Sequence, residues 1–205
     1  MGKHRKSAAV VMVLLGAFMV FVVFFIHNRG KTEEAAEATG KTALEAFRDI
    51  AGESRVESLA TGLAKGSKDP AGRLAEQSVF VIDKDAVGVY LESCMAGAES
   101  TAHAAGITCD ELIMDEWGYD SVEAYRAHME AEVTKFIKQR LAIYAAAEEK
   151  GMRITGREYK KRLPQYARRF RYEDTAGFEA ACLPASIANE MLYDKVVDSM
   201  KGRGE

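Results

Sequence analysis

The chain has 205 residues, of which 48% are hydrophobic, and a formal net charge of −3. The first 31 residues hold five of the 28 Lys and Arg and none of the 31 Asp and Glu. The remainder therefore carries 23 basic and 31 acidic residues, a formal charge of −8. A broadly acidic domain argues against general nucleic-acid binding, and three cysteines in a domain this large do not make a disulfide scaffold.

An uninterrupted apolar segment runs from Ser7 to Ile26 and contains no charged residue. About 20 helical residues, at about 1.5 Å each, match the roughly 30 Å hydrocarbon core of a bilayer. We therefore expect a transmembrane helix at residues 7–28, with residues 7–26 in the bilayer. A cleaved secretory signal is the alternative, although this run exceeds the usual apolar region of about 7–15 residues.

The charges beside this segment predict its orientation. Basic residues in the tail at residues 1–6 precede the span, whereas Arg29 and Lys31 after it are followed closely by glutamates. This bias favours a cytoplasmic N-terminus. We expect a single-pass protein of the cell membrane, with everything after the span outside the cytoplasm.

Residues 29–82 are expected to form a linker and short helices, broken near Gly52 and across residues 66–72. Residues 78–82 (SVFVI) form a short β-branched run. A lone strand would have no partner here, so we expect an extended entry into the next helix. That helix is expected to be capped by Asp83 or Asp85 and to end at Ala105, before Gly106.

A shorter helix is expected over residues 108–117, and the strongest periodic signal follows it. Asp120, with Glu123 three residues on, is expected to cap a helix that stops at Gly151. Its apolar residues recur every three or four positions, as Val122, Tyr125, Met129, Val133, Phe136, Ile137, Leu141 and Tyr144. This stripe predicts one long amphipathic helix.

Three further helices are expected toward the C-terminus. Thr155 and Glu158 have the spacing of a capping box, and Pro164 should kink or split the helix that they begin. Short and longer helices follow over residues 175–181 and 184–200. The predicted fold class of the domain is therefore all-α.

The stretch from about Asp83 to Met200 resembles the C-terminal domain of trigger factor and the helical part of SurA-type chaperones. The likeness rests on WGYDSVEAYRAHMEAEVTKFIKQRLAIYAAAEEKGMRIT (Trp117–Thr155), GREYKKRL (Gly156–Leu163) and NEMLYDKVVDSM (Asn189–Met200). It implies an elongated multi-helix domain at residues 83–205 with long arm helices. It also implies an ATP-independent chaperone, or holdase, for unfolded or newly translocated polypeptides, with no catalytic residues.

Two features depart from the family. Residues 30–82 are too short for its prolyl-isomerase domain, and the ribosome-docking motif is absent. Neither activity is therefore carried over to this chain. The alternative functions are an anchored adaptor that binds one specific envelope partner and a non-catalytic relative of a prolyl isomerase.

The candidate client-contact residues lie on the apolar stripes of two predicted helices. For each of them, packing in the core is the competing interpretation. They are Tyr125, Met129 and Phe136 on the long helix, and Tyr159, Tyr166 and Phe170 on the helix after the capping box.

The segment from Lys150 to Arg171 is strongly basic. A solvated helix face is one interpretation, and an electrostatic contact with anionic lipid headgroups or an acidic client segment is the other. The candidate basic patch comprises Arg157, Lys160, Lys161, Arg168, Arg169 and Arg171.

No catalytic, metal or cofactor site is expected. The Gly30-Lys31-Thr32 and Gly40-Lys41-Thr42 sequences lack the first glycine of a phosphate loop. The four histidines are dispersed, which gives no metal-ligand spacing. Cys94 and Cys109 are the nearest cysteine pair, and either a disulfide between them or free buried thiols are compatible with the sequence.

Overall fold

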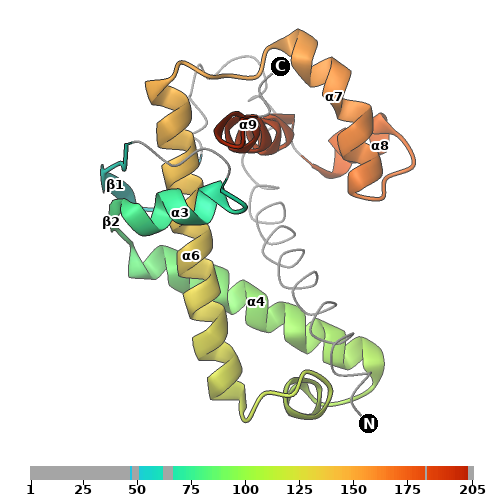
Figure 1. The fold of residues 1–205 in the computed structure, drawn as a ribbon. Helices are drawn as coiled ribbons and strands as arrows, with labels where there is room; N and C mark the ends of the chain where they lie inside the picture. The colour runs from blue at the N-terminus through green and yellow to red at the C-terminus, as the bar shows by residue number, and fades with distance from the viewer. Residues whose placement is uncertain (1–46, 48–50, 62–66, 183, 203–205) are drawn as a thin grey trace. The chain divides into compact units, whose positions relative to one another are not determined.

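The structure is a computed structural model and describes residues 47, 51–61, 67–182 and 184–202. These residues are mostly helical (Figure 1), which confirms the predicted helical character of the domain. Within these ranges no helix is both long and apolar enough to cross a membrane. The span predicted at residues 7–26 lies outside the described residues.

The long elements follow the sequence prediction closely. The bounds in chain order are β1 Arg55–Ser58, α3 Pro70–Gln77, β2 Val79–Val81, α4 Lys84–Ala105, α5 Cys109–Glu111, the π-helix η2 Leu112–Glu116, α6 Val122–Glu149, α7 Gly156–Arg169, α8 Thr175–Ala181 and α9 Pro184–Met200.

A small antiparallel sheet corrects the expectation that residues 78–82 have no strand partner. β1 pairs with β2, with Val56 opposite Phe80 and a bulge before Ser58. Hydrogen bonds outside the ladder hold the pair closed: the Asp83 amide donates to the Ser54 hydroxyl at 2.8 Å, and the Glu53 amide donates to the Asp83 carboxylate at 3.0 Å. The domain is therefore helical with one two-stranded sheet, not purely α.

Local capping chemistry explains where the helices begin. The predicted capping box at Thr155 is confirmed, because the Glu158 amide donates to the Thr155 hydroxyl and the Thr155 amide donates to the Glu158 carboxylate. The predicted cap at Asp120 is wrong by one residue. Ser121 accepts from the Ala124 amide at 3.1 Å and begins α6 instead. Gly106 and Gly151, which follow α4 and α6, adopt positive φ and supply the left-handed turn that ends a helix.

Of the two outcomes expected at Pro164, a kink or a split, the structure rules out the split. α7 continues without a break from Gly156 to Arg169 with Pro164 inside it. Proline removes one backbone donor, but its neighbours keep the helical path because Leu163, Tyr166 and Ala167 are buried beside it.

The chain divides into two compact units, and the division falls within α6, after Thr134. The first unit contains α4, α5, η2 and the start of α6. The second contains the sheet, α3, the rest of α6, α7, α8 and α9. In the second unit α9 contacts both α3 and α7, and it lies between α6 and the α7–α8 pair (Figure 1). Its buried Ile187, Met191 and Val196 provide the centre of that core.

Candidate functional site

Four aromatic rings gather in the first unit, where η2 leads into α6. The ring centroid of Tyr125 lies 5.3 Å from that of Trp117 and 5.1 Å from that of Tyr119. Tyr119 in turn lies 5.7 Å from the His128 ring. These spacings are those of attractive tilted and edge-to-face aromatic pairs. We call Trp117, Tyr119, Tyr125 and His128 the aromatic cluster.

The local backbone explains how these rings meet. η2 is a π-helical turn, in which the Trp117 amide donates to the Leu112 carbonyl at 2.9 Å. Leu112 and Ile113 are buried by this turn, whereas Met114 points outward and is 43% exposed. Gly118 has φ +74°, a conformation that costs glycine little, and it reverses the chain between Trp117 and Tyr119.

The aromatic cluster is only partly closed. Tyr125 is buried, Trp117 and Tyr119 are half-buried, and His128 is exposed. Burial, with electrostatic repulsion from Glu132, raises the pKa of Tyr119. Burial is also the main cause that raises the pKa of Tyr125 well above its usual range. Both phenols therefore stay neutral at physiological pH and present an apolar ring with a polar edge.

The segment of the sequence that contains the aromatic cluster is strongly acidic. Residues 84–134 contain eleven acidic residues and two basic ones, a formal charge of −9. One of the two cations, Arg126, is already paired with Glu92 across α4 and α6. A partly open aromatic surface in an acidic segment suits an apolar segment that also carries Lys or Arg.

The predicted contact residues on α6 belong mainly to the core. Tyr125 and Met129 are 6% exposed. Phe136 is half-buried, with its ring 6.2 Å from the Phe47 ring and 5.2 Å from the Arg140 guanidinium. Core packing, the competing interpretation, therefore describes Tyr125 and Met129 in this structure.

The predicted residues on α7 form a second aromatic group in the second unit. The Tyr166 hydroxyl donates to Asp194 on α9 at 2.5 Å, and the Tyr159 hydroxyl donates to Glu179 on α8 at 2.8 Å. Phe170 stacks on Phe178 with centroids 5.6 Å apart. Tyr166 is buried, whereas Tyr159 and Phe170 are half-buried, so this group holds α7 against α8 and α9.

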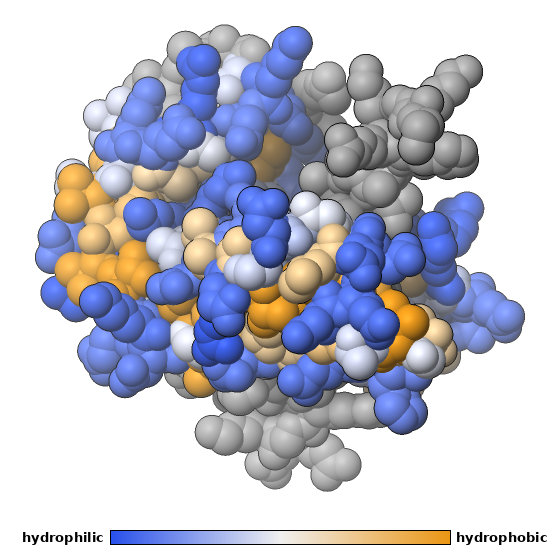
Figure 2. All heavy atoms as spheres, turned by 90° about the horizontal axis from the view of Figure 1, so that it is seen from below, coloured by the Kyte–Doolittle hydropathy of each residue, from blue (hydrophilic) through white to orange (hydrophobic). Residues whose placement is uncertain are grey.

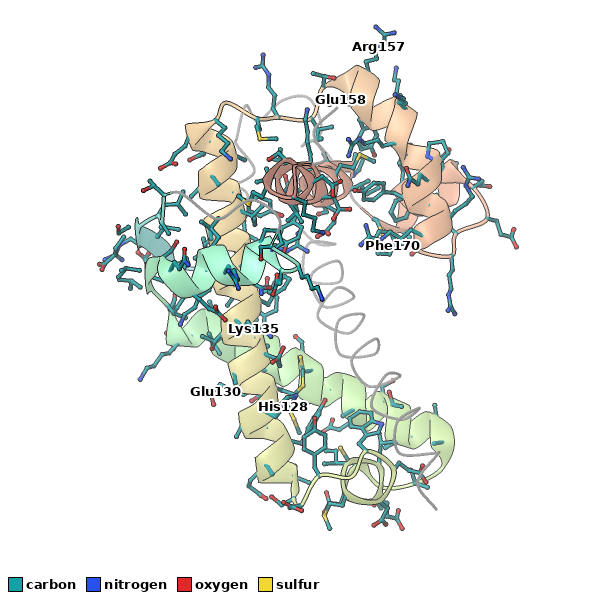
Figure 3. All side chains as sticks on the ribbon, in the orientation of Figure 1. His128, Glu130, Lys135, Arg157, Glu158 and Phe170 are labelled. Atoms are coloured by element: carbon teal, nitrogen blue, oxygen red, sulfur yellow. The ribbon has the colours of Figure 1, made fainter. Side chains whose placement is uncertain are left out.

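The predicted basic residues lie along the outer side of α7. All of them are exposed, but Arg169 differs from the rest, since it forms an ion pair with Asp194 at 2.6 Å and lies over the Tyr166 and Phe170 rings. The others point away from the core, as Figure 3 shows for Arg157. We call these five the basic stripe: Arg157, Lys160, Lys161, Arg168 and Arg171.

A buried ion pair in the second unit was missed by the sequence analysis. Arg140 on α6 and Glu190 on α9 are joined at 2.6 Å, and each side chain is 10% exposed. The signal was present in the sequence, because Arg140 follows Phe136 by four residues and so lies on the apolar stripe. The aromatic cluster was missed for a different reason: Trp117 and Tyr119 lie outside any periodic helix.

Within the described ranges, no three His, Cys, Asp or Glu side chains are placed to hold a metal ion. The three cysteines are free, and Cys94 and Cys182 are buried.

Comparisons with family models, with curated proteins and with solved structures gave no match.

Proposed function

We propose that this chain is a membrane-anchored, ATP-independent chaperone that holds unfolded or newly translocated polypeptides outside the cytoplasm. The observation that carries this proposal is the partly open aromatic cluster, with the exposed Met114 three residues before Trp117 in the chain. Aromatic and methionine side chains adapt to many apolar partners. Binding through such side chains is weak and reversible, and it requires no nucleotide or catalytic group.

The trigger-factor-like sequence and the predicted span complete the proposal. Residues 83–205 are proposed to form an elongated helical domain of the trigger-factor C-terminal type, with α6 as a long arm helix. The helix at residues 7–28 is proposed to hold this domain near the outer membrane surface, where polypeptides emerge from translocation. The acidic surroundings of the aromatic cluster favour clients whose apolar segments carry positive charge.

An anchored adaptor for one envelope partner is the second candidate. It is favoured by the burial of Tyr125, Met129 and Tyr166. Burial removes half of the six predicted client-contact residues from the surface, and a small remaining surface suits one specific partner better than many clients.

The test is an aggregation-protection assay with the full chain in lipid nanodiscs and two unrelated clients. The double variant Met114→Ser/Tyr119→Ser should raise the concentration that gives half-protection by about three- to tenfold, as expected when contact residues are truncated. The matched control is Val79→Ser/Val89→Ser, which replaces side chains that are 53% and 49% exposed elsewhere. It should leave protection unchanged.

The only tryptophan provides a direct readout of binding. Trp117 is the single tryptophan of the chain and belongs to the aromatic cluster. Its emission should shift to shorter wavelength when an unfolded, tryptophan-free client covers it. If the chain protects neither client at excess and the emission does not change, the chaperone proposal fails and the adaptor remains.

A further inference from the structure

The basic stripe follows the helical repeat along one side of α7. Lys160, Lys161 and Arg168 follow Arg157 by three, four and eleven residues, spacings that bring side chains to the same side of a helix. Arg171 follows directly after the helix end and adopts φ 62°. Arg157 and Arg168 lie eleven residues apart, so the charges on α7 are spread over about 16 Å along its axis.

Buried contacts on the opposite side of α7 fix the direction of the stripe. Leu163, Tyr166 and Ala167 are buried, and Tyr166 is bound to Asp194 on α9. A rotation of α7 about its axis would expose these side chains to water. The basic stripe therefore faces away from the second unit's core.

Three carboxylates near α7 are already engaged with other groups. Glu158 binds Lys195 at 2.5 Å and Asp194 binds Arg169 at 2.6 Å, while Glu179 accepts from the Tyr159 hydroxyl. The described carboxylates form no ion pair with the basic stripe. Like charges three and four residues apart repel each other, and within the described residues no ion pair offsets this repulsion, although the Arg168 guanidinium donates to the Pro164 carbonyl at 3.1 Å.

The charge of this segment also contrasts with the rest of the domain. Residues 150–171 contain nine basic residues and one acidic residue, a formal charge of +8. The domain as a whole is acidic, so this concentration of cations on one exposed helix is not a general property of its surface. A linear row of cations matches a flat, extended anionic surface better than a small anionic ligand.

We propose that the basic stripe docks α7 on the anionic surface of a lipid bilayer. The predicted span at residues 7–26 would hold the domain within reach of that surface, which raises its effective concentration there. Arg binds lipid phosphate through paired N–H donors, and Lys binds it as a point charge. This docking does not depend on client binding.

The test compares the full chain with nanodiscs of phosphatidylcholine alone and nanodiscs that also contain phosphatidylglycerol. Acetylation rates of Lys160 and Lys161 are measured by mass spectrometry, with the exposed Lys68 as reference. We expect both stripe lysines to react about threefold or more slowly with the anionic lipid. The difference should disappear at about 0.5 M salt, where exposed charges are screened. The two-lipid comparison is valid whether or not the span inserts.

A second experiment uses a double variant that keeps Lys160 and Lys161, whose acetylation is measured. Arg157→Gln/Arg168→Gln should remove most of the difference between the two lipids. Arg73→Gln/Lys84→Gln removes two equally exposed cations elsewhere and should preserve it. Equal rates in both lipids would overturn the proposal. A slowing in neutral lipid, or one that increases with protein concentration without anionic lipid, would assign the stripe to a protein contact and overturn it as well.

Discussion

Arg140 and Glu190 form an ion pair in the core of the second unit and join α6 to α9 at 2.6 Å. The Arg140 guanidinium also donates to the Tyr144 hydroxyl at 3.1 Å and lies 4.2 Å from the centre of the Tyr193 ring. Burial is the largest single influence on the pKa of Arg140 and lowers it, but the charge of Glu190, its hydrogen bond and the neighbouring Tyr144 and Tyr193 together outweigh burial and keep that pKa raised. Both charges are therefore compensated inside the core.

Replacing only one partner of this ion pair should destabilise the folded protein strongly. Arg140→Met leaves Glu190 buried without its partner, and Glu190→Met leaves the guanidinium in the same state. Each change should lower the free energy of unfolding by about 3–5 kcal/mol, whereas the double variant should lose much less than the sum. Urea denaturation followed by circular dichroism measures both quantities.

The control for this cycle is the exposed pair of Arg55 and Glu57, 3.7 Å apart and about half exposed on each side. Arg55→Met should change the free energy of unfolding by about 0.5 kcal/mol or less. If both Arg140→Met and Glu190→Met behaved like this control, the pair would not be buried in solution.

The ionisation of Glu158 should make the stability of the second unit depend on pH. The ion pair with Lys195 and the hydrogen bond from the Thr155 amide lower the pKa of Glu158 from 4.5 to about 2. A lowered pKa in the folded state adds stability above pH 4.5 that is lost as the pH falls toward 2. Glu158→Gln keeps the capping geometry but loses the charge.

We therefore expect the wild-type chain to be more stable than Glu158→Gln at pH 7, with the gap closing between pH 4.5 and 2. Thermal unfolding over this pH range measures the difference in melting temperature between the wild-type chain and the variant. The exposed Glu76 on α3 offers the control variant Glu76→Gln, whose gap should be small throughout. A gap for Glu158→Gln that stays constant down to pH 2 would contradict the ion pair with Lys195.

Local chemistry accounts for the part of the fold that the sequence predicts well. The bounds of α4 and α6 and the start of α7 follow from caps, glycine stops and apolar stripes, all of which act within a few residues. The basic stripe was predictable for the same reason, because the helical repeat alone places Arg157 and Lys161 on one face.

Contacts between distant residues account for the errors. β1 and β2 lie more than 20 residues apart, and Val56 is surrounded in sequence by charged and polar residues that hide a strand. Glu190 forms an ion pair with Arg140, which lies 50 positions earlier in the sequence. A charged residue on an apolar stripe does not by itself indicate which residue will pair with it. The aromatic cluster depends on the turn at Gly118, whose direction the sequence does not specify.

The cysteines should differ sharply in reactivity with iodoacetamide. Burial raises the pKa of Cys94 to about 11, and Cys94 is 1% exposed. Thiolates are the reactive species, and at pH 8 a thiol of this pKa is ionised to roughly one part in a thousand. Cys109 is half-buried, so we expect it to be alkylated first and Cys94 last.

Peptide mapping by mass spectrometry gives the order of alkylation. In urea all three cysteines should react at similar rates, which controls for differences in digestion and detection. Equal rates for Cys94 and Cys109 under native conditions would contradict the packing of α4 in the first unit.

Pro164 provides a test of the unbroken α7. It is the ninth residue of the helix and is exposed, so alanine at this position meets no steric obstacle from the core. Pro164→Ala restores the backbone donor that reaches the Lys160 carbonyl, which should raise the free energy of unfolding by about 1–3 kcal/mol. The greater freedom of the unfolded chain offsets part of this gain, by about 0.4–1 kcal/mol.

The control is Gln165→Ala, at the next exposed position, which should change the free energy of unfolding by no more than about 0.5 kcal/mol. A loss of stability in Pro164→Ala would show that the chain needs a break at this residue, and α7 would then be two helices.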